Sequence, residues 1–264
     1  MTSEVKHSVL EATNLSIGYK LKKKITAVSE GINFSVPKGQ LVGLVGANGI
    51  GKSTLLRSLT GMQATLGGAI FIDGEDLKTM NPLLLATKLS VVLTEPPASK
   101  NLSVLELVSL GRQPHTNWLG TLSEADKTAI LFALEATEIV ALQQRKCYEL
   151  SDGQLQRVLI ARALAQDTPI IILDEPTTHL DLYHRAYILK LLRRLASETQ
   201  KTILYSTHEI DLAIQLTDTM LVMTPDTNFF DTPKNLIIAG CFDALFPKET
   251  IDFDKDTGRF SIRN

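Results

Sequence analysis

GANGIGKST, residues 46–54, is the stretch of sequence that decides the fold of this chain. An apolar run, residues 41–45, precedes it and a helix-forming run, residues 55–59, follows it, so the expected order is strand, glycine-rich loop and helix. Glycines let successive N–H groups converge on one anion, and a helix that starts near Lys52 adds the positive end of its dipole. The spacing therefore predicts a phosphate-binding loop, which consists of Gly46, Ala47, Asn48, Gly49, Ile50, Gly51, Lys52, Ser53 and Thr54.

Three side chains at the end of this loop have expected roles in phosphate chemistry. Lys52 is expected to bridge the outer phosphates, the Ser53 hydroxyl to hold Mg²⁺, and the Thr54 hydroxyl to contact an inner phosphate.

Length, net charge and cysteine content limit the classes of protein to which this chain can belong. The 264 residues suffice for one large domain or for a domain with an inserted subdomain. The net charge is −2, and Lys and Arg are spread along the sequence apart from a cluster at residues 20–24, so the sequence does not indicate a basic face of the kind that binds nucleic acid. Two cysteines, Cys147 and Cys241, make no disulfide framework and suit a reducing compartment. No secretory leader and no apolar run of about 18 residues is present in the sequence, so a membrane role is expected to come through a partner.

Hydrophobic periodicity predicts one α/β domain over residues 1–264. Alternating residues predict antiparallel strands at 9–19 and 25–36, and short apolar runs predict buried strands at 41–45, 89–93, 169–173, 201–207 and 220–223. Helices are expected after Lys52 and at 103–110, 123–142, 182–197 and 211–216. A helical insertion of about 96–165 separates the strand-rich halves, and about 225–264 form a C-terminal extension with turns and a short helix near Leu236.

Asp174 and Glu175 end the apolar run 169–173, the position at which parallel strands present ligands. Asp174 is expected to fix Mg²⁺, and Glu175 to orient or deprotonate an attacking water. An acidic pair at a strand end is often only solvated or a helix cap, but the phosphate loop upstream favours the catalytic interpretation.

These motifs and four further segments resemble the ATP-binding subunit of an ABC transporter. Ser151, Asp152, Gly153 and Gln154 are similar to the signature that contacts the γ-phosphate held by the opposite subunit, before a helix from Leu155 onward. Residues 178–181, ending in Asp181, resemble the loop that crosses the dimer interface. His208 occupies the position of the family's switch histidine, which contacts the γ-phosphate. Tyr19 occupies the position at which an aromatic residue stacks on adenine in the family, although Tyr19 could equally pack against the core.

The resemblance implies a P-loop NTPase (RecA-like) core with a parallel sheet, an N-terminal antiparallel β subdomain and an inserted α-helical signature subdomain. It also implies ATP and Mg²⁺ as cofactors. Glu175, His208 and Lys52 are the expected catalytic residues, and Ser53, Asp174, Glu95 and Thr94 the expected metal ligands.

Two positions depart from the family pattern. Asp152 replaces a glycine, and its side chain is expected to point away from the nucleotide. Thr94 replaces a glutamine that links Mg²⁺ to the transport subunit. Either Thr94 or the neighbouring Glu95 could ligate a hard cation, and the charge and reach of Glu95 favour it.

Residues 102–112 with Pro114, His115 and Trp118, and the tail from Phe242 to Phe260, are similar to subunits that power import of iron-siderophores, haem and cobalamin. The implied partners are a second copy in a head-to-tail ATP sandwich and a transmembrane permease, a short helix of which is expected to enter a polar groove near residues 94–103. A periplasmic or surface substrate-binding protein is implied indirectly. The implied location is the cytoplasmic face of the cell membrane. Two alternatives remain open: a cytosolic ABC ATPase for iron-sulfur cluster assembly or DNA repair, and a regulatory module that barely hydrolyses ATP.

Overall fold

A six-stranded sheet forms the centre of the protein, in a computed structural model that describes residues 8–21, 24–95, 100–246, 251–255 and 257–262. Its strand order is β10-β9-β3-β8-β7-β6, with all neighbours parallel except β10, which is antiparallel to β9. The strands are β3 (Leu41–Gly46), β6 (Leu89–Val92), β7 (Ile170–Leu173), β8 (Thr202–Ser206), β9 (Thr219–Met223) and β10 (Asn228–Asp231).

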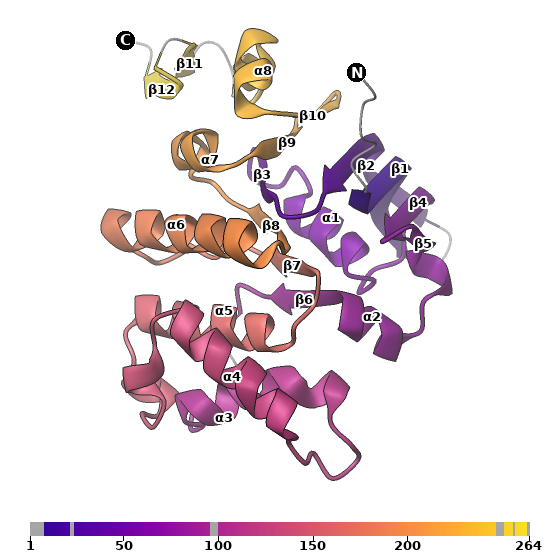
Figure 1. Cartoon of the computed structure of the whole chain (residues 1–264). Helices are drawn as coiled ribbons and strands as arrows, with labels where there is room; N and C mark the ends of the chain where they lie inside the picture. Colours follow the sequence, from indigo (N-terminus) through magenta and orange to yellow (C-terminus); the bar gives the residue numbers. More distant parts are fainter. Residues whose placement is uncertain (1–7, 22–23, 96–99, 247–250, 256, 263–264) are drawn as a thin grey trace, which may run out of the picture.

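The middle strands are buried on both faces, as their continuous apolar runs predict. Every residue of β3, β7 and β8 is buried. Helix α1 (Lys52–Leu59) and a second sheet lie against one face, while α6 (Leu182–Thr199) and α7 (Ile210–Leu216) lie against the other (Figure 1). The carboxyl ends of the parallel strands therefore open on one edge between these layers.

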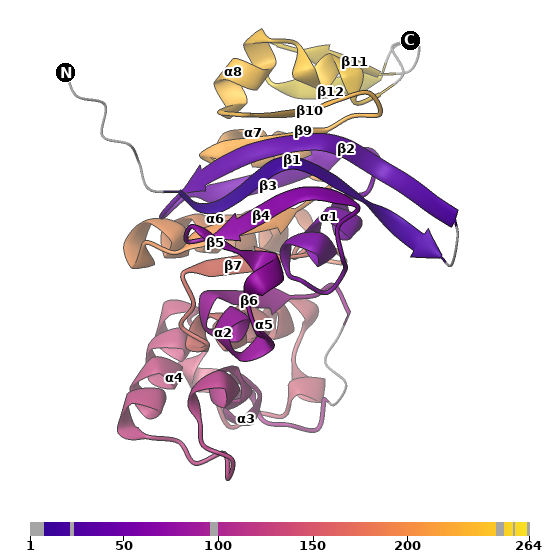
Figure 2. The same cartoon turned by 90° about the vertical axis from the view of Figure 1, so that its right-hand side faces the viewer.

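The second sheet is antiparallel, with the order β2-β1-β4-β5 (Figure 2). Its strands are β1 (Ser8–Leu21), β2 (Lys24–Pro37), β4 (Gly67–Ile72) and β5 (Glu75–Asp76). Alternation along β1 directs Leu10, Leu15 and Ile17 into a core shared with α1 and the central sheet. Both the parallel core and the antiparallel N-terminal subdomain of the predicted fold class are thus confirmed.

Between β6 and β7 the described chain is helical, and these helices form a separate layer at the bottom of Figure 1. They are α3 (Val104–Ser109), η2 (Leu110–His115), α4 (Glu124–Ala136), η3 (Val140–Leu142), η4 (Cys147–Glu149) and α5 (Asp152–Ala165). Capping boxes at Ser103, Ser123 and Ser151 start the three α-helices. The start of the predicted insertion, about residue 96, lies outside the described residues.

The helix predicted at 123–142 is wrong over its last six residues, 137–142. Helix α4 ends at Ala136, where the Thr137 hydroxyl donates to the Ala133 carbonyl at 2.7 Å. Glu138 then adopts φ +58°, which no α-helix continues through. Glu138 is fixed in this turn by Arg194 at 2.8 Å and by the Tyr187 hydroxyl at 2.6 Å, so contacts with α6 override the local apolar spacing.

Strand content in the C-terminal extension exceeds the prediction of turns and one helix. Besides α8 (Pro233–Ile238) and η5 (Cys241–Ala244), it holds β10 and the hairpin β11 (Ile251–Asp254) with β12 (Arg259–Ile262). The ring centroids of Phe253 and Phe260 lie 4.9 Å apart; Phe253 packs on the buried Phe242 and Phe260 on Phe246. These four-residue strands have no fully buried residue and no continuous apolar run, which are the features that made the equally short β6 and β7 recognisable.

The connecting helices α2 (Pro82–Lys88) and η1 (Leu77–Thr79) link β5 to β6. No helix in the described part of the chain is long and apolar enough to cross a membrane.

Candidate nucleotide-binding site

The loop between β3 and α1 requires glycine at three positions. Gly49 and Gly51 have φ +77° and +112°, which favour glycine. A Cβ on Gly51 would lie 2.4 Å from Val28 Cγ1, and one on Gly46 would lie 2.8 Å from the Met223 carbonyl oxygen. Packing and backbone conformation together fix the loop in the shape of an anion cradle.

Lys52 occupies the centre of this cradle. Its Nζ donates to the carbonyl oxygens of Gly46 at 2.9 Å and Ala47 at 3.2 Å. Burial lowers the pKa of Lys52, while the nearby charges of Glu175 and Asp174 act in the opposite direction. A bound polyphosphate would offset this burial cost by pairing with the ammonium group.

Asp174 lies at the end of β7 in a network of hydroxyl groups. Its Oδ1 accepts from Ser206 Oγ at 2.7 Å and from Ser53 Oγ at 3.4 Å, and its carbonyl oxygen accepts from Thr94 Oγ1 at 2.8 Å. The structure thus brings three of the four predicted metal ligands together. Among the described residues no group of three or more His, Cys, Asp or Glu side chains could hold a metal alone. The oxygen-only set fits Mg²⁺, which takes few protein oxygens and completes its shell with phosphate and water.

Glu175 pairs with His208 next to this network. Glu175 Oε1 lies 2.6 Å from His208 Nε2, and Oε2 accepts from Thr178 Oγ1 at 3.1 Å. Glu175 has φ +48°, a strained conformation for this residue type, and its N–H donates to Ser206 Oγ at 2.9 Å. One buried hydroxyl therefore holds the Asp174 carboxylate and the Glu175 backbone, and the two predicted catalytic residues Glu175 and His208 are in contact.

Tyr19 reaches the same loop from β1. Its ring is about half exposed, and its hydroxyl shares a hydrogen bond of 2.9 Å with Thr54 Oγ1. The alternative that Tyr19 packs in the core is wrong, because the ring lies at the surface beside the loop.

The predicted signature residues lie in the helical layer. Helix α5 begins at Asp152, three residues earlier than predicted, because Ser151 Oγ accepts from the Gln154 N–H and caps it. The N–H groups of Asp152 and Gly153 have no acceptor among the described residues, and the Asp152 side chain is exposed. Asp181 caps α6 in the same manner through the N–H of His184.

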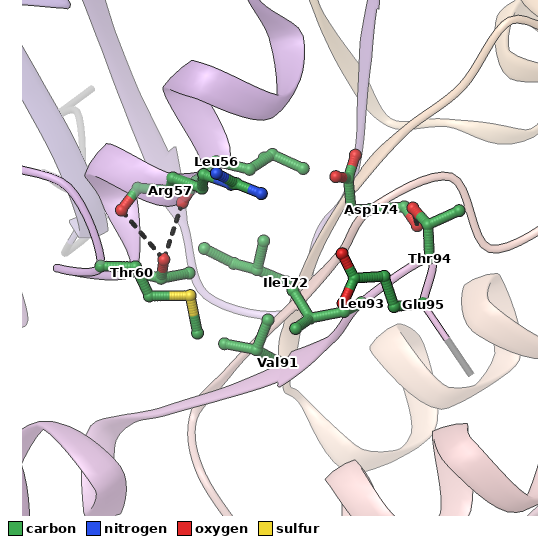
Figure 3. Close-up of a pocket in the computed structure, with 10 residues that line it drawn as sticks. Leu56, Arg57, Thr60, Val91, Leu93, Thr94, Glu95, Ile172 and Asp174 are labelled. Carbon is green, nitrogen blue, oxygen red and sulfur yellow. Dashed lines mark hydrogen bonds between the residues drawn. The ribbon is translucent and has the colours of Figure 1, made fainter. Parts of the chain in front are cut away.

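Glu95 lines a cavity of about 80 Å³ beside this site (Figure 3). Leu56, Arg57 and Thr60 of α1 form one wall, and Thr94, Glu95 and Asp174 face them. The predicted groove at residues 94–103 continues over 96–99, which lie outside the described residues.

Ser206 carried no predicted role, and Thr178 was predicted only as part of the interface loop 178–181. The buried Ser206 hydroxyl bonds the Asp174 carboxylate and the Glu175 N–H, and Thr178 holds the Glu175 side chain. A polar residue that ends the apolar run of β8 is the signal that could have identified Ser206, because that strand is adjacent to β7.

Comparisons with known proteins agree with this geometry. A family model described as ABC transporter matches residues 29–178. The iron(3+)-hydroxamate import ATP-binding protein FhuC of Bacillus subtilis is 38% identical over 218 residues, which cover 83% of this chain and 80% of that protein.

Two solved structures show the same architecture. One is an ABC transporter assigned to the metal-chelate type, in an inward-facing conformation, with a TM-score of 0.77 and 29% identity over 90% of this chain and 89% of the other. The other is a bacterial ABC transporter cassette in a dimeric structure, with a TM-score of 0.69 and 28% identity over 81% of this chain and 94% of the other.

Proposed function

This chain belongs to the ABC transporter family, as an ATP-binding ATPase subunit, and on that premise we propose that it hydrolyses ATP to power import of an iron chelate through a separate permease. The observation that carries the proposal is the convergence of Lys52, Ser53, Asp174, Glu175 and His208 at one edge of the sheet. No observation favours the alternatives of cluster assembly or DNA repair.

The phosphate loop holds the nucleotide through backbone donors and Lys52. The open N–H groups at the start of α1 and the ammonium of Lys52 face the position of the β- and γ-phosphates, and the exposed ring of Tyr19 stacks on the adenine. On binding, Nζ exchanges the carbonyl oxygens of Gly46 and Ala47 for phosphate oxygens.

Ser53, Asp174 and either Thr94 or Glu95 are the residues that would hold Mg²⁺. The Ser53 hydroxyl and the Asp174 carboxylate already lie within 3.4 Å of each other. The Thr94 hydroxyl already donates to the Asp174 carbonyl oxygen, whereas the Glu95 carboxylate lines the adjoining cavity. Because a charged carboxylate binds Mg²⁺ more strongly than a hydroxyl, Glu95 remains the preferred ligand. The bound cation neutralises charge on the phosphates.

Glu175 and His208 orient the attacking water. Glu175 Oε1 accepts a hydrogen bond from His208, and the other carboxylate oxygen is held by Thr178. With the carboxylate fixed at both oxygens, it can accept the proton of a water that lies in line with the γ-phosphate, and His208 contacts the γ-phosphate itself.

Two copies complete the site, since Ser151, Asp152, Gly153 and Gln154 begin a helix in a separate layer from the phosphate loop (Figure 1). The open N–H groups of Asp152 and Gly153 bind the γ-phosphate on the second copy, and Asp181 lies at the interface between the copies. Two identical sites follow from this symmetry. Loss of the γ-phosphate releases these contacts and opens the dimer.

A short helix of the permease would dock beside the metal site. The cavity behind Thr94 is followed by a groove of about 440 Å³ that shares Thr60, Met62 and Val91 with it. Apolar side chains line most of this groove, which suits one face of an amphipathic helix. Because metal ligands border the same cavity, movement of the permease segment would be coupled to the nucleotide.

The remaining partners follow from the import function. The chain would lie at the cytoplasmic face of the cell membrane, held there by the permease, and a periplasmic or surface binding protein would deliver the iron chelate to that permease. Capture of a polytopic membrane protein with this chain supports the proposal. Capture of a soluble assembly or repair complex in its place contradicts it.

The direct test measures ATP hydrolysis in the presence of Mg²⁺. Lys52→Ala is expected to lower kcat/KM at least 100-fold, since several kcal/mol of transition-state charge stabilisation are lost, while Lys127→Ala on the exposed side of α4 leaves it unchanged. Wild-type activity in Lys52→Ala, or no Mg²⁺-dependent hydrolysis by the wild type, would overturn the proposal.

A further inference from the structure

His184 connects the two segments that the proposed function places at the interface with the second copy. It lies in the first turn of α6, and its ring packs on Gly153 in the first turn of α5. A Cβ on Gly153 would lie 2.8 Å from His184 Cδ2, 3.4 Å from Cγ and 3.5 Å from Nε2. The imidazole therefore fills the space into which any other residue at position 153 would extend.

The backbone of Gly153 gives no reason of its own for a glycine. Its conformation is helical and its φ is not among the positive values, so every residue type can adopt it. Glycine in a helix costs about 1 kcal/mol relative to alanine. The close approach of the His184 ring supplies a physical reason to tolerate this cost.

The ring is held in place from its other side. Asp181 Oδ1 accepts from the His184 N–H at 2.8 Å and lies 2.9 Å from His184 Nδ1. Because a carboxylate only accepts, Nδ1 carries a hydrogen, and the edge with Cδ2 and Nε2 is turned to Gly153. The Tyr183 ring contacts the imidazole edge-on, with centroids 5.3 Å apart.

We propose that His184 is a positioning residue that joins the start of α6 to the start of α5. Asp181 and the signature residues 151–154 then meet the second copy and its ATP as one rigid unit. This inference rests on the proposed two-copy function. Without the ring, the open N–H groups of Asp152 and Gly153 are no longer fixed relative to Asp181. Misplacement by about 1 Å of a group that positions substrate costs on the order of 100-fold in rate.

The test separates closure from nucleotide binding. His184→Ala is expected to lower kcat roughly 10- to 100-fold, with KM for ATP and ATP affinity of the single chain unchanged within about twofold, because the phosphate loop is untouched. In a Glu175→Gln background, the same change is expected to weaken ATP-dependent dimerisation. His184→Asn, whose amide can donate to Asp181 in place of Nδ1, is expected to recover most of both losses.

Lys190→Ala, at an exposed position of the same helix, is the matched control and is expected to behave as wild type. Gly153→Ala alone is expected to impair dimerisation because its Cβ displaces the ring. Combined with His184→Ala it is expected to add no further loss, since the space is then vacant.

Three results overturn the inference: wild-type kcat and dimerisation in His184→Ala, losses in the double variant that multiply, or no recovery in His184→Asn. If Lys52→Ala abolishes hydrolysis but His184→Ala leaves it unchanged, this inference is wrong and the proposed function is still supported. Absence of hydrolysis in the wild type removes both.

Discussion

At the scale of single residues, Ser206 holds both the Asp174 carboxylate and the backbone of Glu175. Its hydroxyl donates to Asp174 Oδ1 and accepts from the Glu175 N–H, and it is completely buried. An unsatisfied buried N–H costs about 1–3 kcal/mol, so the hydroxyl stabilises the strained backbone of Glu175 and positions Asp174 at the same time.

Ser206→Ala is therefore expected to lower kcat for ATP roughly tenfold and the free energy of unfolding by about 1–3 kcal/mol. Steady-state ATPase assays and urea unfolding measure the two effects. Ser90→Ala removes another buried hydroxyl of the same sheet, which accepts from Thr168 at 3.1 Å, and serves as the control that loses stability but keeps kcat. Equal kcat values for Ser206→Ala and Ser90→Ala would contradict the role of Ser206.

The residues predictable from sequence are those whose chemistry is local. The glycines and Lys52 are recognisable because one loop supplies both the backbone conformation and the charge. The role of Ser206 and the contact of Thr178 with Glu175 were not predicted, because they depend on which strand and which turn lie next to Asp174 and Glu175. The effect of Asp152 and the choice between Thr94 and Glu95 stay predictions.

At the scale of elements, a buried ion pair holds three helices of the helical layer together. Arg112 in η2 donates from Nε to Asp126 Oδ1 at 2.8 Å and from Nη1 to the Ala165 carbonyl at 2.7 Å. Both charged side chains are nearly inaccessible to solvent. Asp126 also accepts from Ser123 as part of the α4 capping box, so the ion pair as a whole connects η2, α4 and the end of α5.

Asp126→Asn is expected to lower the free energy of unfolding by about 3–5 kcal/mol, because it leaves the Arg112 charge buried without a partner. Glu124→Gln, which removes the exposed pair with Lys127, is expected to cost less than about 1 kcal/mol. A loss of similar size in both variants, measured by urea unfolding at neutral pH, would argue against this account.

The same carboxylate predicts a dependence on pH. Hydrogen bonds from Ser123, and next from Arg112, lower the pKa of Asp126 from 3.8 to about 2. Because the folded pKa is the lower one, the contribution is complete above pH 3.8 and is lost as the pH falls through 2. Wild type should lose stability in this window more steeply than Asp126→Asn, and parallel profiles would refute the assignment.

Elements with long periodic patterns were predictable from sequence, and short or tertiary-determined ones were not. The strands β3, β7 and β8 follow from continuous apolar runs. The end of α4 depends on contacts of Glu138 with α6, and β10, although as long as β7, has no fully buried residue and no continuous aliphatic run. Neither the break nor the short strand has a periodic signal.

At the scale of the whole molecule, each copy presents a phosphate loop and a signature helix in different layers. The proposed active site therefore belongs to a pair of chains. This arrangement could be anticipated only through family resemblance, because no pattern within one chain shows which surface faces a second copy. The exposed Leu182 and Tyr183 beside Asp181 are consistent with such a contact.

The most direct measurement is the mass of Glu175→Gln in solution, determined by sedimentation or light scattering with ATP and with ADP. The account predicts a dimer with ATP, a monomer with ADP, and a monomer under both conditions when Lys52→Ala is added, because the γ-phosphate bridges the two copies. A mass that does not respond to ATP, or an ATP-dependent dimer that forms without Lys52, would contradict the account.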